Sequence, residues 1–245
     1  MRVITTDVDG AEHATGTVVV IDVIRAFTTA AVALDVGAAR IVCVEHLEEA
    51  HGLRRRLGPD TVLMGEERGL RPDGFDLGNE TDGPTAALVA GHTVVQRTSN
   101  GTRGLIRAGA ATYQLAAAAV TAGATARWIA VHAPDDPVTL VTTGATSEDG
   151  AVAEHITELL RRGTGDGPAL ATQVRAAQDE HVRLWQRARD GVEFAAFRDD
   201  VARCAEVDRY ATALVARADD DVAGRPVLSA VPALGWPTWA GAVGL

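Results

Sequence analysis

Acids, arginines and hydroxyl groups recur at four places along this chain, each directly after an apolar run with strand character. The four segments span residues 21–29, 65–79, 97–104 and 142–149. In proteins, carboxylates hold Mg²⁺, arginine grips phosphate oxygens through paired N–H groups, and a helix N-terminus adds further donors. This combination of residue types is typical of metal-assisted chemistry at a phosphate group, in which a bound water attacks phosphorus.

The first segment, IDVIRAFTT, sets Asp22 near the end of its apolar run and Arg25 and Thr28 at the start of a predicted helix. Asp22 is a candidate metal ligand, and Arg25 is a candidate phosphate contact. The segment also fits a structural interpretation, in which Asp22 and Arg25 form a buried ion pair and threonine caps the helix. The residues alone leave both interpretations open.

The second segment is a glycine-rich loop that holds Glu67, Arg68 and Asn79. Glycine lets a backbone approach a ligand closely, and loops on a rigid scaffold often carry function. The alternative is a solvated loop in which Asp76 and Asn79 only form turns.

The third segment, RTSNGTRG, runs from an apolar strand through Thr98, Ser99 and Asn100 into a helix that begins near Gly101 and Thr102. Hydroxyl groups, an amide and the backbone N–H groups of a helix start together make a cradle for an anion. An ordinary Ser, Thr or Asn helix cap is the alternative.

The fourth segment ends on Glu148 and Asp149 at the start of another predicted helix. These acids are either surface charges that complement the helix dipole or further metal ligands. Polar segments that follow the strands of one parallel sheet meet at its carboxyl edge, where such folds bind ligands. The sequence therefore predicts one shared pocket.

The composition narrows the partners and the chemistry. The formal charge is −10, all 23 cationic residues are arginine, and lysine is absent. An acidic chain is unsuited to nucleic acid, and without lysine a Schiff base or a GK[ST] phosphate loop is impossible. The seven histidines show no metal-binding spacing, so we treat them as structural or surface residues. No apolar stretch is long enough to span a membrane, and two distant cysteines without a signal-like start favour a cytoplasmic setting.

Strand-like and helix-like patterns alternate along the chain, which predicts an α/β fold of one domain over residues 1–245. We expect a three-layer α/β/α arrangement, with a largely parallel or mixed sheet and a helical C-terminal segment packed on it. The predicted strands are residues 17–24, 40–44, 61–64, 93–97, 111–116, 138–143 and 227–231. The predicted helices are residues 26–36, 46–57, 101–108, 120–131, 148–162, 169–189 and 194–210.

Five motifs occur in a fixed order, namely IDVIRAFTT, GEERG, GFDLGN, TSNGTRGL and SEDGAVAEHI. Together they resemble the 2-phosphosulfolactate phosphatase family of coenzyme M biosynthesis, clearly over residues 17–162 and weakly at 198–200 and 207–209. The resemblance implies a Mg²⁺-dependent phosphatase with an α/β fold that forms a homodimer. Its implied substrate is a small anionic phosphate ester, 2-phosphosulfolactate.

The resemblance also assigns roles by motif. The predicted catalytic residues are Asp22, Arg25, Glu67, Arg68 and Asn100. The predicted phosphate or substrate contacts are Thr28, Asn79, Thr98, Ser99, Gly101 and Thr102. The predicted metal ligands are Asp22, Glu67, Glu148 and Asp149. The chain departs from the family's usual GGERGG loop at Glu66 and Leu70, which puts the identity of the substrate in question more than the reaction.

Other interpretations stay open. Asp7 and Asp9 in TDVDG resemble the DxDG motif of haloacid-dehalogenase-type phosphatases, in which the first aspartate attacks phosphorus and the second acts as acid and base. A member of the resembled family retuned to another small organic phosphate is a second alternative, and a non-catalytic protein that binds a phosphorylated metabolite is a third. No Ser, Cys or Asp is placed convincingly as a nucleophile, so we expect direct attack by water.

Overall fold

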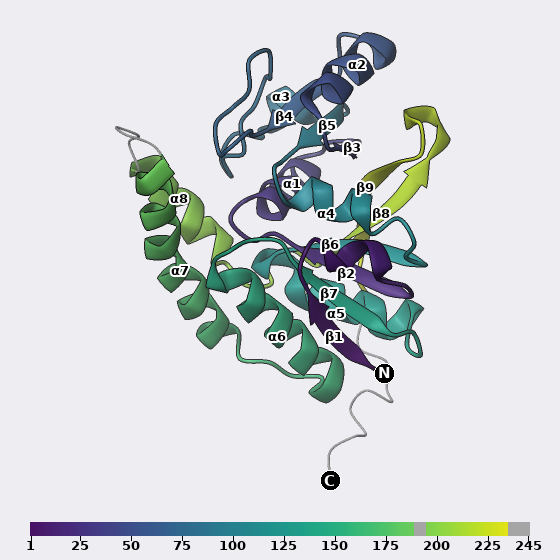
Figure 1. Cartoon of the computed structure of the whole chain (residues 1–245), viewed down its shortest axis with the longest axis vertical. Coiled ribbons are helices and arrows are strands. Elements are labelled where there is room, and N and C mark those ends of the chain that lie inside the picture. The colour runs from purple at the N-terminus through teal and green to yellow at the C-terminus, as the bar shows by residue number, and fades with distance from the viewer. Residues whose placement is uncertain (189–194, 235–245) are drawn as a thin grey trace.

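Nine strands and eight α-helices make up the part of the chain that the computed structural model describes, residues 1–188 and 195–234 (Figure 1). The strands are β1 (Val3–Thr6), β2 (Thr17–Ile21), β3 (Arg40–Val44), β4 (Val62–Gly65), β5 (Thr93–Arg97), β6 (Tyr113–Ala117), β7 (Val138–Thr142), β8 (Thr212–Asp219) and β9 (Arg225–Pro232). The helices are α1 (Ala26–Asp35), α2 (Leu47–Leu57), α3 (Ala86–Val89), α4 (Gly101–Arg107), α5 (Ala122–His132), α6 (Ser147–Arg162), α7 (Gly167–Ala188) and α8 (Ala195–Cys204). Short 3-10 helices span Gly10–His13, Ala119–Thr121 and Asp220–Val222.

All nine strands belong to one mixed sheet, in the order β1-β7-β2-β6-β8-β9-β3-β5-β4. Strands β1, β7, β2 and β6 are parallel to one another, and so are β3, β5 and β4. The antiparallel hairpin β8–β9 joins these two parallel blocks, because β8 pairs with β6 and β9 pairs with β3. The C-terminal hairpin thus lies in the middle of the sheet and connects its two halves (Figure 1).

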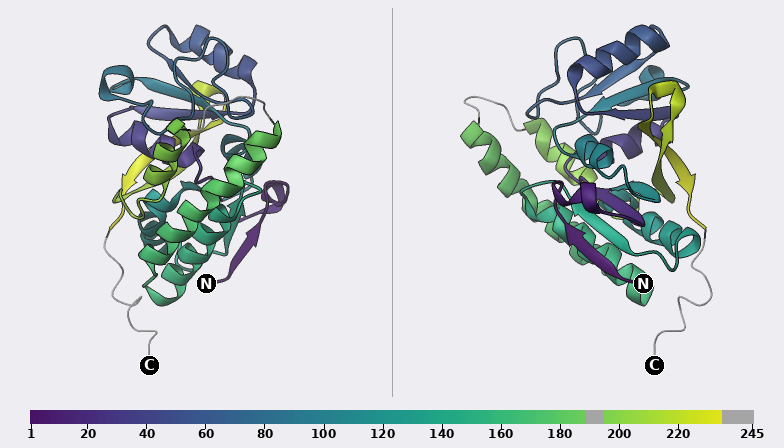
Figure 2. Two further views of the ribbon diagram at one scale, coloured as in Figure 1. Left: turned by 90° about the vertical axis from the view of Figure 1, so that its left-hand side faces the viewer. Right: turned by 45° about the vertical axis from the view of Figure 1, so that its right-hand side comes forward.

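The sheet curves around α1 and α4, which lie between its two halves (Figures 1 and 2). Val18 and Val20 of β2 share one core with Ile41 and Cys43 of β3 and with the apolar side of α1. The other face of β2 packs on α5 and α6, and the other face of β3 packs on α2. Both strands are therefore buried on both sides, which explains their uninterrupted apolar runs.

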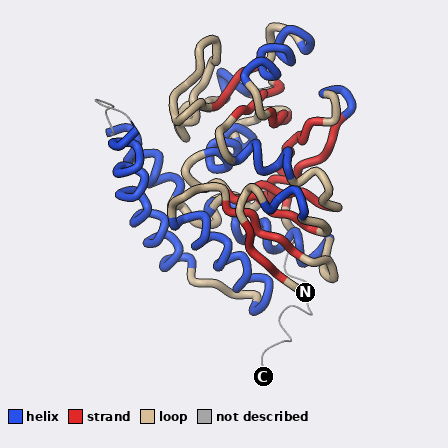
Figure 3. The backbone as a smooth tube through the Cα atoms, in the orientation of Figure 1, coloured by secondary structure: helices blue, strands red, loops and turns tan. Residues whose placement is uncertain are grey.

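The helices α7 and α8 form an arm along one flank of the molecule (Figures 2 and 3). Helix α7 lies beside α6, and its residues Leu170 and Val174 join the core beneath α5 and α6. Helix α8 buries Val201 and Cys204 before the chain enters β8. Among the described residues, no helix combines the length and the apolar character needed to cross a membrane.

The predicted α/β class is confirmed, with a mixed sheet and helices on both of its faces. Strand β8 is missing from the prediction. Its sequence, TALVARAD, is rich in alanine and has weak strand character, so its backbone pairing with β6 and β9 decides its conformation. The edge strand β1 and the short α3 are also absent from the predicted elements.

The predicted helix over residues 194–210 is too long. Helix α8 ends at Cys204, and the chain then turns at Asp208, which has a φ of 55°. The Asp208 carboxylate accepts a hydrogen bond from the Gly123 N–H at the start of α5, at 2.5 Å, so this segment caps a neighbouring helix. The predicted helix ends Arg189 and Phe194 lie outside the described residues.

Candidate active site

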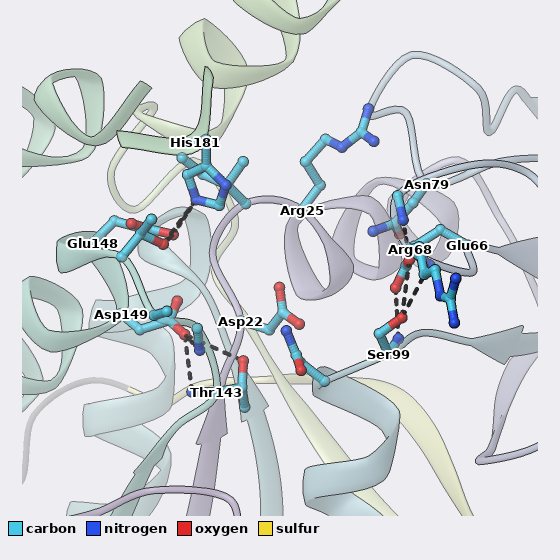
Figure 4. Close-up of a pocket in the computed structure, with 16 residues that line it drawn as sticks. Asp22, Arg25, Glu66, Arg68, Asn79, Ser99, Thr143, Glu148, Asp149 and His181 are labelled. Atoms are coloured by element: carbon cyan, nitrogen blue, oxygen red, sulfur yellow. Dashed lines mark hydrogen bonds and ion pairs between the residues drawn. The ribbon is translucent and has the colours of Figure 1, made fainter. Parts of the chain in front are cut away.

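A pocket of about 360 Å³ opens where the carboxyl ends of both halves of the sheet converge (Figure 4). The strands of one parallel block point in the opposite direction to those of the other, because three antiparallel pairings separate β6 from β3. Because the sheet curves, the ends of β2 and β7 still meet the ends of β4 and β5 at one place. The pocket is lined by Asp22, Ile24, Arg25, Glu66, Arg68, Gly69, Asn79, Ser99, Asn100, Thr143, Gly144, Ala145, Thr146, Glu148, Asp149 and His181.

Asp22 directly follows β2 and lies between the two walls of the pocket (Figure 4). Its Oδ1 accepts a hydrogen bond from the backbone N–H of Ala26, in the first turn of α1, at 3.1 Å. Gly101 passes so close that a Cβ there would lie 2.8 Å from Asp22 Oδ2. Burial, and then the charge of Asp149 and other pocket acids, raises the pKa of Asp22 to about 8.

Asp149, in the first turn of α6, ties the ends of β2 and β7 together. Its Oδ1 accepts a hydrogen bond from the Val23 N–H at 3.0 Å. Its Oδ2 accepts from the Thr143 N–H, the Thr143 hydroxyl and the Gly144 N–H at 3.0, 3.2 and 2.8 Å. Burial and the neighbouring Glu148 raise the pKa of Asp149 to about 6 in spite of these donors. The hydrogen bonds fix the wall that Thr143 and Gly144 form.

Glu148 lies beside Asp149 and reaches toward α7. Its Oε1 accepts a hydrogen bond from the Thr146 hydroxyl at 2.8 Å and lies 2.7 Å from His181 Nε2. Its Oε2 is buried and has no hydrogen-bond partner within the described chain. A buried carboxylate oxygen without a donor is costly, so this atom marks a place for a donor or a cation from outside the chain.

Glu66 organises the opposite wall. Its Oε1 accepts a hydrogen bond from the Ser99 N–H at 2.5 Å, and its Oε2 accepts from the Gly69 N–H at 2.5 Å and the Ser99 hydroxyl at 3.1 Å. Arg68 lies in the same loop with a φ of 52°, and its N–H donates to Ser99 Oγ at 3.3 Å. These contacts join the loop after β4 to the turn after β5 and hold Arg68 at the pocket.

Arg25 and Asn79 complete this wall. Arg25 NH1 donates to Asp200 Oδ2 at 2.5 Å, and both side chains are buried. The sequence interpretation pairs Arg25 with Asp22. In the structure, Arg25 forms a buried ion pair with Asp200. Asn79 also lines the pocket, and its Oδ1 is buried without a hydrogen-bond partner in the part of the chain described here.

The structure brings most of the predicted site residues together in the pocket lining, and the others lie outside this lining. Those that line the pocket are Asp22, Arg25, Arg68, Asn79, Ser99, Asn100, Glu148 and Asp149. Those that lie outside its lining are Thr28, Glu67, Thr98, Gly101 and Thr102. Thr28 turns its hydroxyl away, donating to the Val23 carbonyl oxygen at 2.8 Å.

Thr98, which precedes α4, and Thr102, in the first turn of α4, form hydrogen bonds with each other. The Thr98 N–H donates to Thr102 Oγ1 at 2.9 Å, and the Thr102 N–H donates to Thr98 Oγ1 at 3.1 Å. The Thr98 hydroxyl thus satisfies one N–H of the first turn, in part as the cap alternative expects, whereas the N-cap residue Asn100 forms no such side-chain bond and lines the pocket with Ser99. Gly101 contributes by having no side chain, because a Cβ at this position would lie too close to the Asp22 carboxylate.

Glu66, and not the predicted Glu67, is the glutamate of this loop that lines the pocket. Glu67 is half-exposed and lies 3.6 Å from Arg97 NH2. The sequence did contain a signal for Glu66, because it is the first polar residue after the strand. His181 carried no such signal, because it lies in a helix far along the chain and reaches the pocket only through tertiary packing.

Asp7 and Asp9, the pair considered as a haloacid-dehalogenase-type nucleophile motif, do not line the pocket. Asp7 Oδ1 accepts a hydrogen bond from the Gly10 N–H at 2.9 Å, as in an ordinary turn. Asp9 is 82% exposed and pairs with Arg107 and Arg103. The structure therefore favours a surface turn for this motif.

The chain is similar in sequence to proteins of one phosphatase family. A family model described as 2-phosphosulpholactate phosphatase matches residues 3–219. The chain belongs to this family. A probable 2-phosphosulfolactate phosphatase of Thermus thermophilus is 34% identical over 211 residues, which cover 82% of this chain and 87% of the relative. Another, of Deinococcus radiodurans, is 35% identical over 172 residues, which cover 66% and 71%.

A third probable 2-phosphosulfolactate phosphatase, of Gloeobacter violaceus, is 32% identical over 198 residues, covering 78% of this chain and 84% of the relative. The family match extends well past the five sequence motifs. It includes α7, α8 and β8, so the arm and the first strand of the central hairpin belong to the 2-phosphosulpholactate phosphatase fold.

Proposed function

We propose that this protein is a Mg²⁺-dependent phosphoric monoester hydrolase that converts 2-phosphosulfolactate to sulfolactate and inorganic phosphate. Membership of the 2-phosphosulpholactate phosphatase family and the names of its relatives support the reaction and the substrate. The observation that carries the proposal is the division of the pocket into two walls (Figure 4). Arg25 and Arg68 lie on one side, Glu148 and Asp149 lie on the other, and Asp22 lies between them.

The arginines of the wall that Arg25, Arg68 and Glu66 form suit the anionic groups of a small phosphate ester. Arginine binds phosphate, carboxylate and sulfonate oxygens through paired N–H groups. Arg25 and Arg68 are therefore assigned to these oxygens, with Asn100 as a further polar contact. Positive charges held in fixed positions also stabilise the charge that develops on the phosphoryl oxygens in the transition state. The pocket volume of about 360 Å³ admits a three-carbon ester.

The acidic wall fits a Mg²⁺ ion that keeps part of its water shell. Such an ion is commonly held by one or two carboxylates, water and substrate phosphate oxygens. Asp22 and Glu148 are the assigned carboxylates, because the pKa of Asp22 is raised and Glu148 Oε2 lacks a donor in the described structure. Among the described residues, no three acidic, histidine or cysteine side chains are grouped so that they could hold a metal ion by themselves, so the proposal requires water and substrate oxygens as the remaining ligands. When bound, Mg²⁺ neutralises phosphate charge and lowers the pKa of a coordinated water.

Water is the assigned nucleophile. Ser99 is the one serine of the pocket lining, and its hydroxyl already donates to Glu66 while accepting from the Arg68 N–H. A hydroxyl engaged in this way positions the loop and is poorly placed for attack. A pre-steady-state burst of one phosphate per subunit would contradict direct attack by water, because it would indicate a phosphoenzyme.

The decisive experiment measures phosphate release from 2-phosphosulfolactate, phospholactate and unrelated organic phosphates, with Mg²⁺ and then with EDTA. We expect turnover that EDTA abolishes and that is fastest with 2-phosphosulfolactate. Faster turnover of another ester would show a retuned substrate within the same reaction class. Binding of phosphorylated ligands without any release would show a non-catalytic family member.

We also propose a homodimer in the cytoplasm. Family resemblance supports the homodimer, and two buried free cysteines, Cys43 and Cys204, are consistent with a reducing compartment. Light scattering coupled to gel filtration tests the first point, and a mass of one subunit would refute it. Fractionation of the source cells tests the second.

A further inference from the structure

Asp200 is a buried acid that lies outside the pocket lining and contacts Arg25, an arginine that lines the pocket. It lies in α8 and is 3% exposed. Its Oδ2 accepts a hydrogen bond from Arg25 NH1 at 2.5 Å, and its Oδ1 accepts from the N–H and the hydroxyl of Thr81, both at 2.7 Å. Both carboxylate oxygens are therefore held, by donors from two other segments of the chain.

Thr81 connects Asp200 to the loop that carries Asn79. The backbone oxygen of Thr81 accepts a hydrogen bond from Arg203 NH1 at 3.0 Å, and Arg203 lies one turn after Asp200 in α8. Helix α8 thus forms hydrogen bonds with three groups of Thr81, namely the backbone N–H, the hydroxyl and the backbone carbonyl oxygen. The result is one buried network that joins the arm, the start of α1 and the end of the glycine-rich loop.

Stability alone is a weak reason for this network, because well-packed apolar residues often replace a buried ion pair without loss. Its location suggests a second role. Arg25 lines the pocket, and a guanidinium binds an oxyanion well only when its planar fork is correctly oriented. We propose that Asp200 is a positioning residue that holds Arg25 in the orientation that binds the substrate's phosphate group. This inference rests on the proposed function.

The first test compares three single variants. Asp200→Asn keeps the size of the side chain and removes its charge, so we expect kcat/KM to fall by about 100-fold, as expected for a misplaced binding group. Thr81→Val removes one hydrogen bond to Asp200 and leaves the ion pair, so we expect a loss of about 3- to 10-fold. Asp199→Asn, an exposed neighbour in the same helix, is the matched control and should stay within about twofold.

A double-mutant cycle separates positioning from general support of the fold. If Asp200 acts through Arg25, adding Asp200→Asn to Arg25→Met changes kcat/KM by less than about twofold. If Asp200 only supports the fold, the two losses multiply, and the inference is overturned. Unfolding temperatures are measured for every variant, and assays are run below them. Should Asp200→Asn fail to fold, Thr81→Val decides, and an unchanged kcat/KM in that variant overturns the inference.

Binding of inorganic phosphate, measured by calorimetry, gives a readout that does not require turnover. We expect the wild type to bind phosphate and Asp200→Asn to bind it at least about tenfold more weakly, since a charge-assisted hydrogen bond contributes about that much. Wild-type binding without release from any ester refutes the proposed hydrolase alone. Wild-type binding and turnover that Asp200→Asn leaves intact refute the role of Asp200 alone. Neither binding nor turnover in the wild type refutes both.

Discussion

The carboxylates of the pocket differ in how the chain holds them. Asp149 accepts four hydrogen bonds, whereas Asp22 accepts one backbone hydrogen bond and faces other acids. Burial raises the pKa of both, to about 6 for Asp149 and about 8 for Asp22. In the metal-free protein at neutral pH, Asp22 therefore keeps its proton, and a cation in the pocket would favour the ionised form.

This difference predicts how stability depends on pH. An unfolded aspartate titrates near 3.8, so between pH 4 and about 8 the native state binds a proton at Asp22 that the unfolded state lacks. The stability of the metal-free protein therefore falls as pH rises through this window. We expect unfolding temperatures measured in EDTA from pH 5 to pH 9 to show this fall in the wild type and a much smaller one in Asp22→Asn. Equal slopes in the two proteins would show that another group is responsible.

The neighbouring glutamates Glu66 and Glu67 offer a matched test of which one serves the pocket. Glu66→Gln weakens the contacts that fix Ser99 and the Arg68 loop, so we expect kcat/KM to fall by about 100-fold. Glu67→Gln removes an exposed charge near Arg97, so we expect a change of less than about fivefold. Phosphate-release kinetics at saturating Mg²⁺ measure both. A larger loss in the Glu67 variant would reverse the assignment.

Among the secondary-structure elements, α4 begins in close contact with the pocket residue Asp22. A Cβ at Gly101 would lie 2.8 Å from Asp22 Oδ2 and 3.0 Å from Ala26 Cβ. Glycine is needed here because a larger residue would prevent the close approach of the starts of α1 and α4. The residues just before both helices, Arg25 and Asn100, line the pocket. The position of α4 against α1 is thus part of the site.

We expect Gly101→Ala to displace Asp22, abolish most of the activity and cost roughly 1–3 kcal/mol of stability through overpacking. Gly150→Ala is the control. It lies in α6, where an added Cβ would meet no atom within 4 Å, so reduced freedom of the unfolded chain should stabilise the protein by about 0.4–1 kcal/mol. Urea unfolding and phosphate release measure both variants. Full activity in Gly101→Ala would show that the helices can separate without moving Asp22.

For the whole molecule, the hairpin β8–β9 is the connection between the two halves of the sheet. Leu214 of β8 is fully buried in the core that both halves share. We expect Leu214→Ala to cost about 2–5 kcal/mol and to lower the midpoint of a single unfolding transition. Leu88→Ala, at a site 48% exposed, should change stability little. Separate transitions for the two halves, seen by circular dichroism and tryptophan fluorescence, would show that the hairpin does not couple them.

Much of the fold and part of the site follow from local patterns in the sequence. The run TVVVIDVI predicts a strand buried on both faces, and β2 is such a strand, although it ends at Ile21. The polar residues after β2, β5 and β7 are predictable because strand ends and helix starts leave local signals in the sequence. Glu66 is harder to choose over Glu67, because adjacent glutamates look alike until the direction of each side chain is known.

The sequence by itself determined the α/β class, the family and the residue types of a phosphate pocket, since these depend on local periodicity and on motifs a few residues long. The tertiary structure decided which of these residues meet. Strand β8 forms because β6 and β9 supply its backbone partners. His181 reaches the pocket because α7 packs beside it, and Asp200 reaches Arg25 because α8 does so. Contacts between residues far apart in the chain depend on the packing of whole elements, and no local pattern records them.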